Sequence, residues 1–279
     1  MKRTLPSHWA AGSAVAVTLL VNGVASAQRA PWRDADAASA DERAAKLRRD
    51  VRTELPLVAF AYAAQGARKG SAGAQGFALG SMAPQQRATL GGGVTVWGAP
   101  IERLSLIGSA ERNVWGSFAP SAAAVVHLLG DRRQGWSLGG LGKFKVDGFA
   151  SGPSRDEIES ELELGALISF AELGGFHFDI NLIAGRGLGD DGETDTETRL
   201  RFGRDLGELV WLGLDAQARL RVSGPKYLPN GRVWDFAAGP QLMLGSGSFF
   251  AVLTAGPATM GQLSTNVGFT SMLGIGGAT

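Results

Sequence analysis

The sequence predicts an all-β fold, a closed antiparallel up-and-down transmembrane β-barrel of about 12 strands, within a range of 10 to 12. Three observations predict it. Polar and apolar residues alternate over long stretches, short and long connections alternate along the chain, and aromatic residues gather near the predicted strand ends. The clearest stretch begins at Glu157, where charged residues occupy one face and almost only apolar residues the other. Such a strand separates water from an apolar phase.

Strands are predicted from Leu55 onward. Many exceed the about five or six residues usual in soluble sheets and approach the about nine to eleven that a tilted bilayer crossing needs. The predicted strands cover residues 55–65, 87–97, 101–111, 118–129, 136–149, 157–171, 175–188, 196–205, 209–222, 233–244, 248–256 and 265–274. Short connections are expected at 98–100, 130–135, 172–174, 206–208 and 245–247, and longer ones at 66–86, 112–117, 150–156, 189–195, 224–232 and 257–264.

The N-terminal part of the chain differs from the predicted barrel. Residues 1–27 have a basic start at Lys2 and Arg3, a mostly apolar run, and the small-x-small sequence Ala25-Ser26-Ala27. This pattern predicts a secretory signal peptide cleaved near Ala27, with a membrane anchor as the alternative. Residues 28–54 are predicted to be a polar helical or flexible lead-in, with a plug or a periplasmic contact as the alternative. The barrel is expected to occupy 55–279.

Composition excludes several classes of function. Removal of the predicted signal leaves 25 basic and 26 acidic residues, a net charge of −1, and no basic stripe favours a nucleic-acid partner. The chain contains no cysteine, which excludes disulfides, thiolate catalysis and cysteine zinc sites. We predict no cofactor, no metal site and no catalytic residue.

The charged face of the strands is predicted to line the interior of the barrel, because a basic residue facing mid-bilayer lipid costs about 2–4 kcal/mol. Opposite charges are expected to pair across strands, with Lys143 facing Glu163, Lys145 facing Glu161, Arg199 facing Asp215 and Arg221 facing Asp235. The alternative is a soluble sheet that turns the same charges to water. The predicted pore-lining residues are Lys143, Lys145, Glu159, Glu161, Glu163, His177, Asp179, Arg199, Arg201, Asp215, Arg219, Arg221 and Asp235.

Tryptophans lie within a few residues of the predicted strand ends. They are Trp97, Trp115, Trp136, Trp211 and Trp234. Membrane barrels concentrate such rings in two interfacial girdles, whereas soluble cores more often place tryptophan in the middle of a strand.

These patterns resemble those of bacterial outer-membrane β-barrel proteins over about residues 55–279. The resemblance implies a closed barrel in the outer membrane of a Gram-negative-type cell, with short periplasmic turns and longer outer loops. One feature departs from the class: many members end in an aromatic residue, whereas this chain ends Gly274-Ile275-Gly276-Gly277-Ala278-Thr279.

Two functions fit the predicted barrel, a narrow charge-lined passive pore for small solutes or a structural surface protein in contact with outer-membrane lipid. One alternative is an outer-membrane enzyme acting on lipid or peptide, because His177 shares a polar face with Asp179 and Ser169 lies across the next turn. The other is a soluble exported β-sheet binding protein. The oligomeric state is left open.

Overall fold

A computed structural model describes the part of the chain that forms the barrel and a short segment before it. The described residues are 57–58, 61–64, 66–82, 88–112, 118–130, 135–147, 159–173, 176–189, 192–207, 209–223, 234–246, 248–259 and 267–279. The predicted signal peptide and the lead-in at 28–54 lie outside these residues. Within the described residues, no helix is long and apolar enough to cross a membrane.

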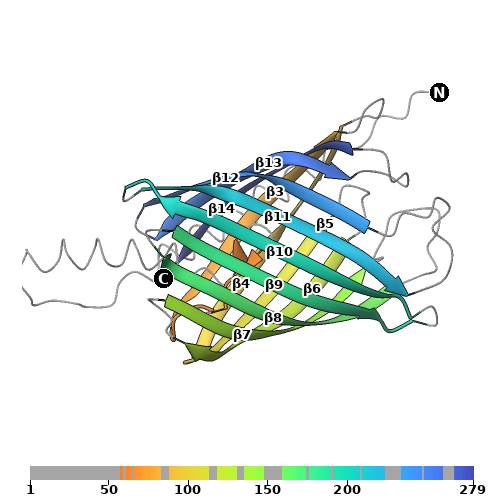
Figure 1. Ribbon diagram of the computed structural model, residues 1–279, viewed down its shortest axis with the longest axis horizontal. Helices are drawn as coiled ribbons and strands as arrows, with labels where there is room; N and C mark the ends of the chain where they lie inside the picture. The colour runs from red at the N-terminus through yellow and green to blue at the C-terminus, as the bar shows by residue number, and fades with distance from the viewer. Residues whose placement is uncertain are drawn as a thin grey trace, which may run out of the picture.

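Twelve antiparallel strands form one closed barrel, which confirms the predicted fold class (Figure 1). Each strand pairs with its neighbours in sequence, and β14 pairs with β3 to close the sheet. The strands are β3 (Ala72–Met82), β4 (Thr89–Ile101), β5 (Leu104–Arg112), β6 (Phe118–Gly130), β7 (Gly135–Asp147), β8 (Glu159–Leu173), β9 (Phe176–Gly187), β10 (Thr194–Asp205), β11 (Val210–Ser223), β12 (Trp234–Ser246), β13 (Phe249–Thr259) and β14 (Val267–Ala278).

The predicted strand at 55–65 is wrong, because this region does not join the barrel wall. It contains two short strands, β1 (Leu57–Val58) and β2 (Ala61–Tyr62), which pair only with each other. The first barrel strand is β3, which the sequence analysis placed inside a long connection at 66–86. Its sequence is rich in glycine and alanine, so its two faces differ little in hydropathy and the alternation is weak. Because β3 takes the place of the strand predicted at 55–65, the number of barrel strands still agrees with the prediction.

The barrel turns its apolar residues outward and its polar residues inward. Leu164 is 60% exposed, and Leu162, Phe144 and Leu212 are exposed in the same way, whereas Asn181 and Gln241 are completely buried. A soluble sheet would bury the leucines and expose the polar residues. An apolar surface that surrounds the whole molecule requires an apolar surrounding phase.

Short connections lie at one end of the barrel, which we call the turn end, and longer ones at the opposite loop end. The short connections are 102–103, 131–134, 174–175, 206–209 and 247–248. The predicted connection at 98–100 is displaced to 102–103, where Arg103 adopts a positive φ of 75°. Its displacement coincides with an irregular register between Gly98 and Ile101. Gly73 pairs with Ala278 at the turn end, so both ends of the barrel chain lie there.

The final strand extends further than predicted. The sequence analysis ended it at Gly274, whereas β14 continues to Ala278 and keeps its pairing with both β13 and β3. The glycines at 276 and 277 weaken the strand pattern. Backbone pairing on both sides nevertheless stabilises this segment, and Gly276 leaves space for the ring of Phe250, which approaches within 2.5 Å of a Cβ built there.

Aromatic residues on the outer face gather near both ends of the barrel. Trp136 is exposed near the turn end, where Phe176 stacks on Phe202 at 5.1 Å between ring centroids. Near the loop end, Trp234 is exposed and stacks on Phe236 at 5.5 Å. These rings occupy the positions expected of interfacial girdles. Trp115 lies outside the described residues.

Trp97 and Trp211 do not belong to these girdles, although they lie near strand ends as predicted. Both point into the barrel and are buried. Glycines on the neighbouring strands provide the space: a Cβ at Gly73 would lie 2.3 Å from the ring of Trp97, and one at Gly203 would lie 2.3 Å from the ring of Trp211. These rings therefore lie against the inner surface of the wall.

A charged residue introduced on the outer face of the barrel tests whether that face contacts lipid. We expect Leu164→Arg to lower the free energy of unfolding by about 2–4 kcal/mol, because position 164 lies near the middle of β8 and faces lipid. Unfolding by guanidinium in phospholipid vesicles, followed by tryptophan fluorescence, measures the change. Val222→Arg is the matched control, since it lies on the same face at the loop end and is expected to cost only about 0–1 kcal/mol. Equal, negligible costs at both positions would indicate an outer face in water.

Candidate functional site in the barrel interior

The predicted pore-lining residues lie on the inner face of the barrel wall wherever their side chains are described. Glu163, Asp179, Arg201 and Asp215 are buried, and Lys143, Lys145, Glu161, His177, Arg199, Arg219 and Asp235 are half-buried. The side chains of Glu159 and Arg221 lie outside the described part of their strands. A pore-lining role for these residues stays a prediction.

Two of the predicted cross-strand pairs occur in β7 and β8. Lys143 lies opposite Glu163, and its Nζ donates to both carboxylate oxygens at 2.9 and 3.1 Å. Lys145 lies opposite Glu161 in the same ladder. The shared face and the antiparallel register thus bring opposite charges together, as the alternation predicted.

The other two predicted pairs are wrong by two residues. Arg201 lies opposite Asp215, whereas Arg199 faces Gln217. Asp235 lies opposite Arg219 rather than Arg221. In each hairpin the centre of the connection lies one residue from its predicted position. Because two antiparallel strands slide past each other, a displacement of one residue at the connection changes the register by two.

Asp179 is the centre of a buried network on β8, β9 and β10. It accepts a hydrogen bond from Arg201 Nε at 2.7 Å, and its other oxygen accepts the hydroxyl proton of Ser169. Arg201 also lies over the ring of Trp211, 5.9 Å from the centroid. A charge buried inside the barrel needs such partners, because desolvation without compensation is costly.

A second network lies nearer the loop end. Arg219 contacts the carboxylates of Asp195 and Glu161, the latter at 3.4 Å. Arg199 pairs with Glu197 at 2.9 Å, two residues away on the same face of β10. Acidic and basic groups are therefore interleaved along β7 to β11 instead of occupying opposite walls.

The contacts of His177 and Ser169 differ from those of a catalytic triad. His177 Nε2 lies 3.3 Å from Asp205, whereas Ser169 donates its hydroxyl proton to Asp179. A nucleophilic serine would instead give its proton to the histidine. The described residues also contain no group of three or more His, Asp or Glu side chains able to hold a metal ion.

The interior holds a stretch of chain that precedes the barrel, here called the inner segment and defined as the described residues 61–64 and 66–67. Asn181 accepts a hydrogen bond from the Tyr62 amide at 2.7 Å and donates one to the Tyr62 carbonyl at 2.8 Å. Ser169 Oγ accepts from the Ala64 amide at 2.8 Å, and Ser105 Oγ from the Ala67 amide at 2.7 Å. The segment thus follows the wall from β9 toward β5.

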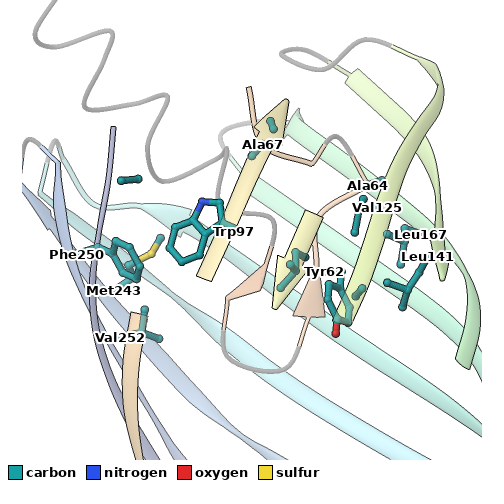
Figure 2. Packing of buried hydrophobic residues seen from close by; sticks show 14 of the residues in the cluster. Tyr62, Ala64, Ala67, Trp97, Val125, Leu141, Leu167, Met243, Phe250 and Val252 are labelled. Carbon is teal, nitrogen blue, oxygen red and sulfur yellow. The ribbon is translucent and has the colours of Figure 1, made fainter. Parts of the chain in front are cut away.

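Apolar side chains surround the inner segment in the half of the barrel nearer the turn end. Figure 2 shows Trp97, Met243, Phe250 and Val252 on one side of the segment. Val125, Leu141 and Leu167 form a second group, beside Tyr62 of the segment. All of these residues are at most 5% exposed. These residues come from strands around the barrel, so apolar side chains face the inner segment from several parts of the wall.

The sequence analysis missed the polar residues that hold the inner segment. Ser105 and Ser169 are single small polar residues within apolar surroundings, and Gly139 is one glycine among many. A Cβ at Gly139 would lie 2.6 Å from the Ala64 carbonyl oxygen, so the glycine permits close approach of the segment. Asn181 lies on the same polar face as His177, and Ser169 was considered only in the enzyme alternative; neither was connected with the inner segment. No local pattern connects these positions to residues 61–67.

Comparison with known proteins shows likeness in structure alone. No protein-family model matches the sequence, and a search of curated proteins finds no match. The NanC porin superposes with a TM-score of 0.55 at 7% identity, over 72% of this chain and 98% of that one. The chain therefore has the fold of an outer-membrane β-barrel, the class that the sequence predicted.

Two further structures are similar at lower scores. The KdgM porin, solved in complex with disordered oligogalacturonate, has a TM-score of 0.49 at 8% identity, over 73% of this chain and 98% of that one. The translocator domain of the autotransporter NalP from Neisseria meningitidis has a TM-score of 0.45 at 14% identity, over 86% of this chain and 96% of that one.

The buried pair of Arg201 and Asp179 is expected to be stronger than the surface pairs. Arg201→Met leaves the Asp179 carboxylate without its cation, and we expect a loss of about 3–5 kcal/mol in the free energy of unfolding. Arg201→Met combined with Asp179→Asn removes the isolated charge and should restore most of this loss. Unfolding in phospholipid vesicles measures both; a double variant as unstable as the single one would contradict the pairing.

Proposed function

We propose that this chain forms a narrow, charge-lined passive pore for small solutes in the bacterial outer membrane. Residues 1–27 would direct export and be removed near Ala27, and residues 28–54 would form a lead-in to the barrel. The barrel then spans the outer membrane, with its outer face in contact with lipid. The observation that carries this proposal is the reversal of polarity, with leucines outside and ionic residues inside.

The interleaved charges support weak selectivity between anions and cations. Lys143, Arg199 and Arg219 lie on the same wall as Glu161, Glu163 and Glu197, and several of these groups pair with each other. A wall whose acidic and basic side chains form ion pairs presents little net charge to a passing ion. The electric field of each charged group is compensated by its partner within a few ångströms. We therefore favour small polar solutes over strongly charged ones.

The inner segment and the apolar cluster support a path that is closed toward the turn end. Tyr62 makes two hydrogen bonds to Asn181 and lies 5.4 Å from the guanidinium of Arg199. Conduction along the whole barrel requires this segment to move away from the wall. The barrel would therefore conduct rarely or at low conductance until the segment is displaced.

Conductance across planar lipid bilayers tests the pore. We expect the natural chain to give small or rare openings and Asn181→Leu to give several-fold more current, because the variant removes both hydrogen bonds to Tyr62. Ser109→Ala is the matched control. Ser109 bonds to Ser121 at 2.7 Å on the wall and makes no described hydrogen bond to the inner segment.

The result separates the pore from the structural role. An unchanged current in Ser109→Ala together with an increase in Asn181→Leu supports a pore that the inner segment closes. If the natural chain and both variants carry no current at any voltage, the result would contradict the pore and favour a structural surface protein.

A further inference from the structure

The barrel wall recognises the inner segment through its main chain. Wall side chains supply each of the four described hydrogen bonds between the two, and the inner segment supplies only backbone groups, at Tyr62, Ala64 and Ala67. Asn181 bonds to both the amide and the carbonyl of Tyr62, which is the pattern that a neighbouring β-strand would provide. These four bonds therefore recognise the main chain of the segment, which pairs as a strand at Tyr62 and turns between Ala63 and Gly66.

Apart from Tyr62, whose ring lies beside Arg199, the inner segment carries small side chains where it lies against the wall. Ala61, Ala63, Ala64 and Ala67 are all at most 1% exposed. Gly139 on β7 leaves the space in which the Ala64 backbone lies. The Cβ of a residue at position 139 would collide with that backbone, so the wall is shaped for a main chain in close contact.

The buried ionic pair of Arg201 and Asp179 determines whether Ser169 donates or accepts in its hydrogen bond to the inner segment. The hydroxyl has one proton, and Ser169 donates it to Asp179, whose other oxygen is bound by Arg201. Only the lone pairs of the hydroxyl oxygen are then left for the Ala64 amide. Arg201 and Asp179 therefore act as positioning residues that make Ser169 an acceptor for a peptide N–H.

From these contacts we infer that the inner wall at Asn181, Ser169, Gly139 and Ser105 is a binding site for the main chain of a polypeptide that carries small side chains where it meets Ser169, Gly139 and Ser105. The inner segment is its resident occupant. Another polypeptide of the same character, arriving from the turn end, binds there when the segment is displaced. This inference adds a ligand class to the proposed pore, but binding to the wall does not depend on conduction.

The first experiment displaces the resident segment in the full-length protein. Tyr62→Pro, Ala64→Pro and Ala67→Pro together remove every amide proton that the described wall side chains accept. Ala61→Cys supplies a single thiol, since the natural chain has no cysteine. We expect the thiol to be protected from a polar thiol reagent in the natural background and to react in the triple-proline background.

Ala64→Gly with Ala67→Gly is the matched control, because it changes two side chains and keeps both amides. Its thiol at position 61 is expected to stay protected. A thiol that remains protected in the triple-proline variant would overturn the inference, since the segment would then be held by something other than its backbone. Heat-dependent mobility on gels confirms that each variant has folded as a barrel.

The second experiment measures binding of a separate peptide with the sequence of residues 57–68, labelled with fluorescein. Fluorescence anisotropy with the detergent-solubilised triple-proline variant gives the dissociation constant. We expect the peptide to bind this variant at least about tenfold more tightly than the natural protein, whose own segment occupies the wall. A peptide methylated on the amide nitrogens of Tyr62 and Ala64 is expected to bind about tenfold or more weakly.

Each outcome bears on the inference. Equal binding of the methylated and unmethylated peptides, or no binding to a wall whose thiol shows that the segment has left, would overturn it. Binding by a protein that conducts nothing would support the site while contradicting the pore, so the two proposals fail separately.

Discussion

The requirement that every backbone polar group be satisfied in an apolar phase determines most of this structure. A sheet in lipid has no water at its edges, so it must close on itself, and β14 accordingly pairs with β3. Closure gives every strand an inner and an outer face. Because side chains alternate along a strand, one row of residues meets lipid and the next meets the interior.

The interior must then accommodate the polar row. Lys143 with Glu163 and Arg201 with Asp179 compensate charges that would otherwise be isolated. Most of the described charged side chains that face inward lie on β7 to β12, whereas β13, β14 and β3 to β6 contribute mainly small or apolar residues such as Phe250, Met272 and Ala123. The inner segment lies between these two walls, with Tyr62 beside Arg199 and Ala64 within the apolar cluster.

The sequence predicts those features that repeat along each strand. Alternation placed Leu162 outside and Glu163 inside, and the connection lengths separated a turn end from a loop end. It does not predict features that depend on single contacts. A change of one residue at a connection moved Arg199 away from Asp215, and the weak alternation of Ala72–Met82 concealed a barrel strand. Trp97 and Trp211 point inward, where glycines on the neighbouring strands leave room for their rings. The hydrogen bonds of Tyr62 to Asn181 join residues 119 positions apart, which no local pattern reveals.

The most direct measurement of the central claim is the alternation of lipid contact along β8. Single cysteines introduced at Glu161, Leu162, Glu163 and Leu164 can each carry a small fluorophore, because the natural chain has no other thiol. Nitroxide-labelled lipids then quench fluorophores that touch the bilayer. Strong quenching at 162 and 164 with weak quenching at 161 and 163 is the predicted result. Equal quenching at all four positions, or the reverse pattern, would contradict a barrel that turns its apolar rows to lipid.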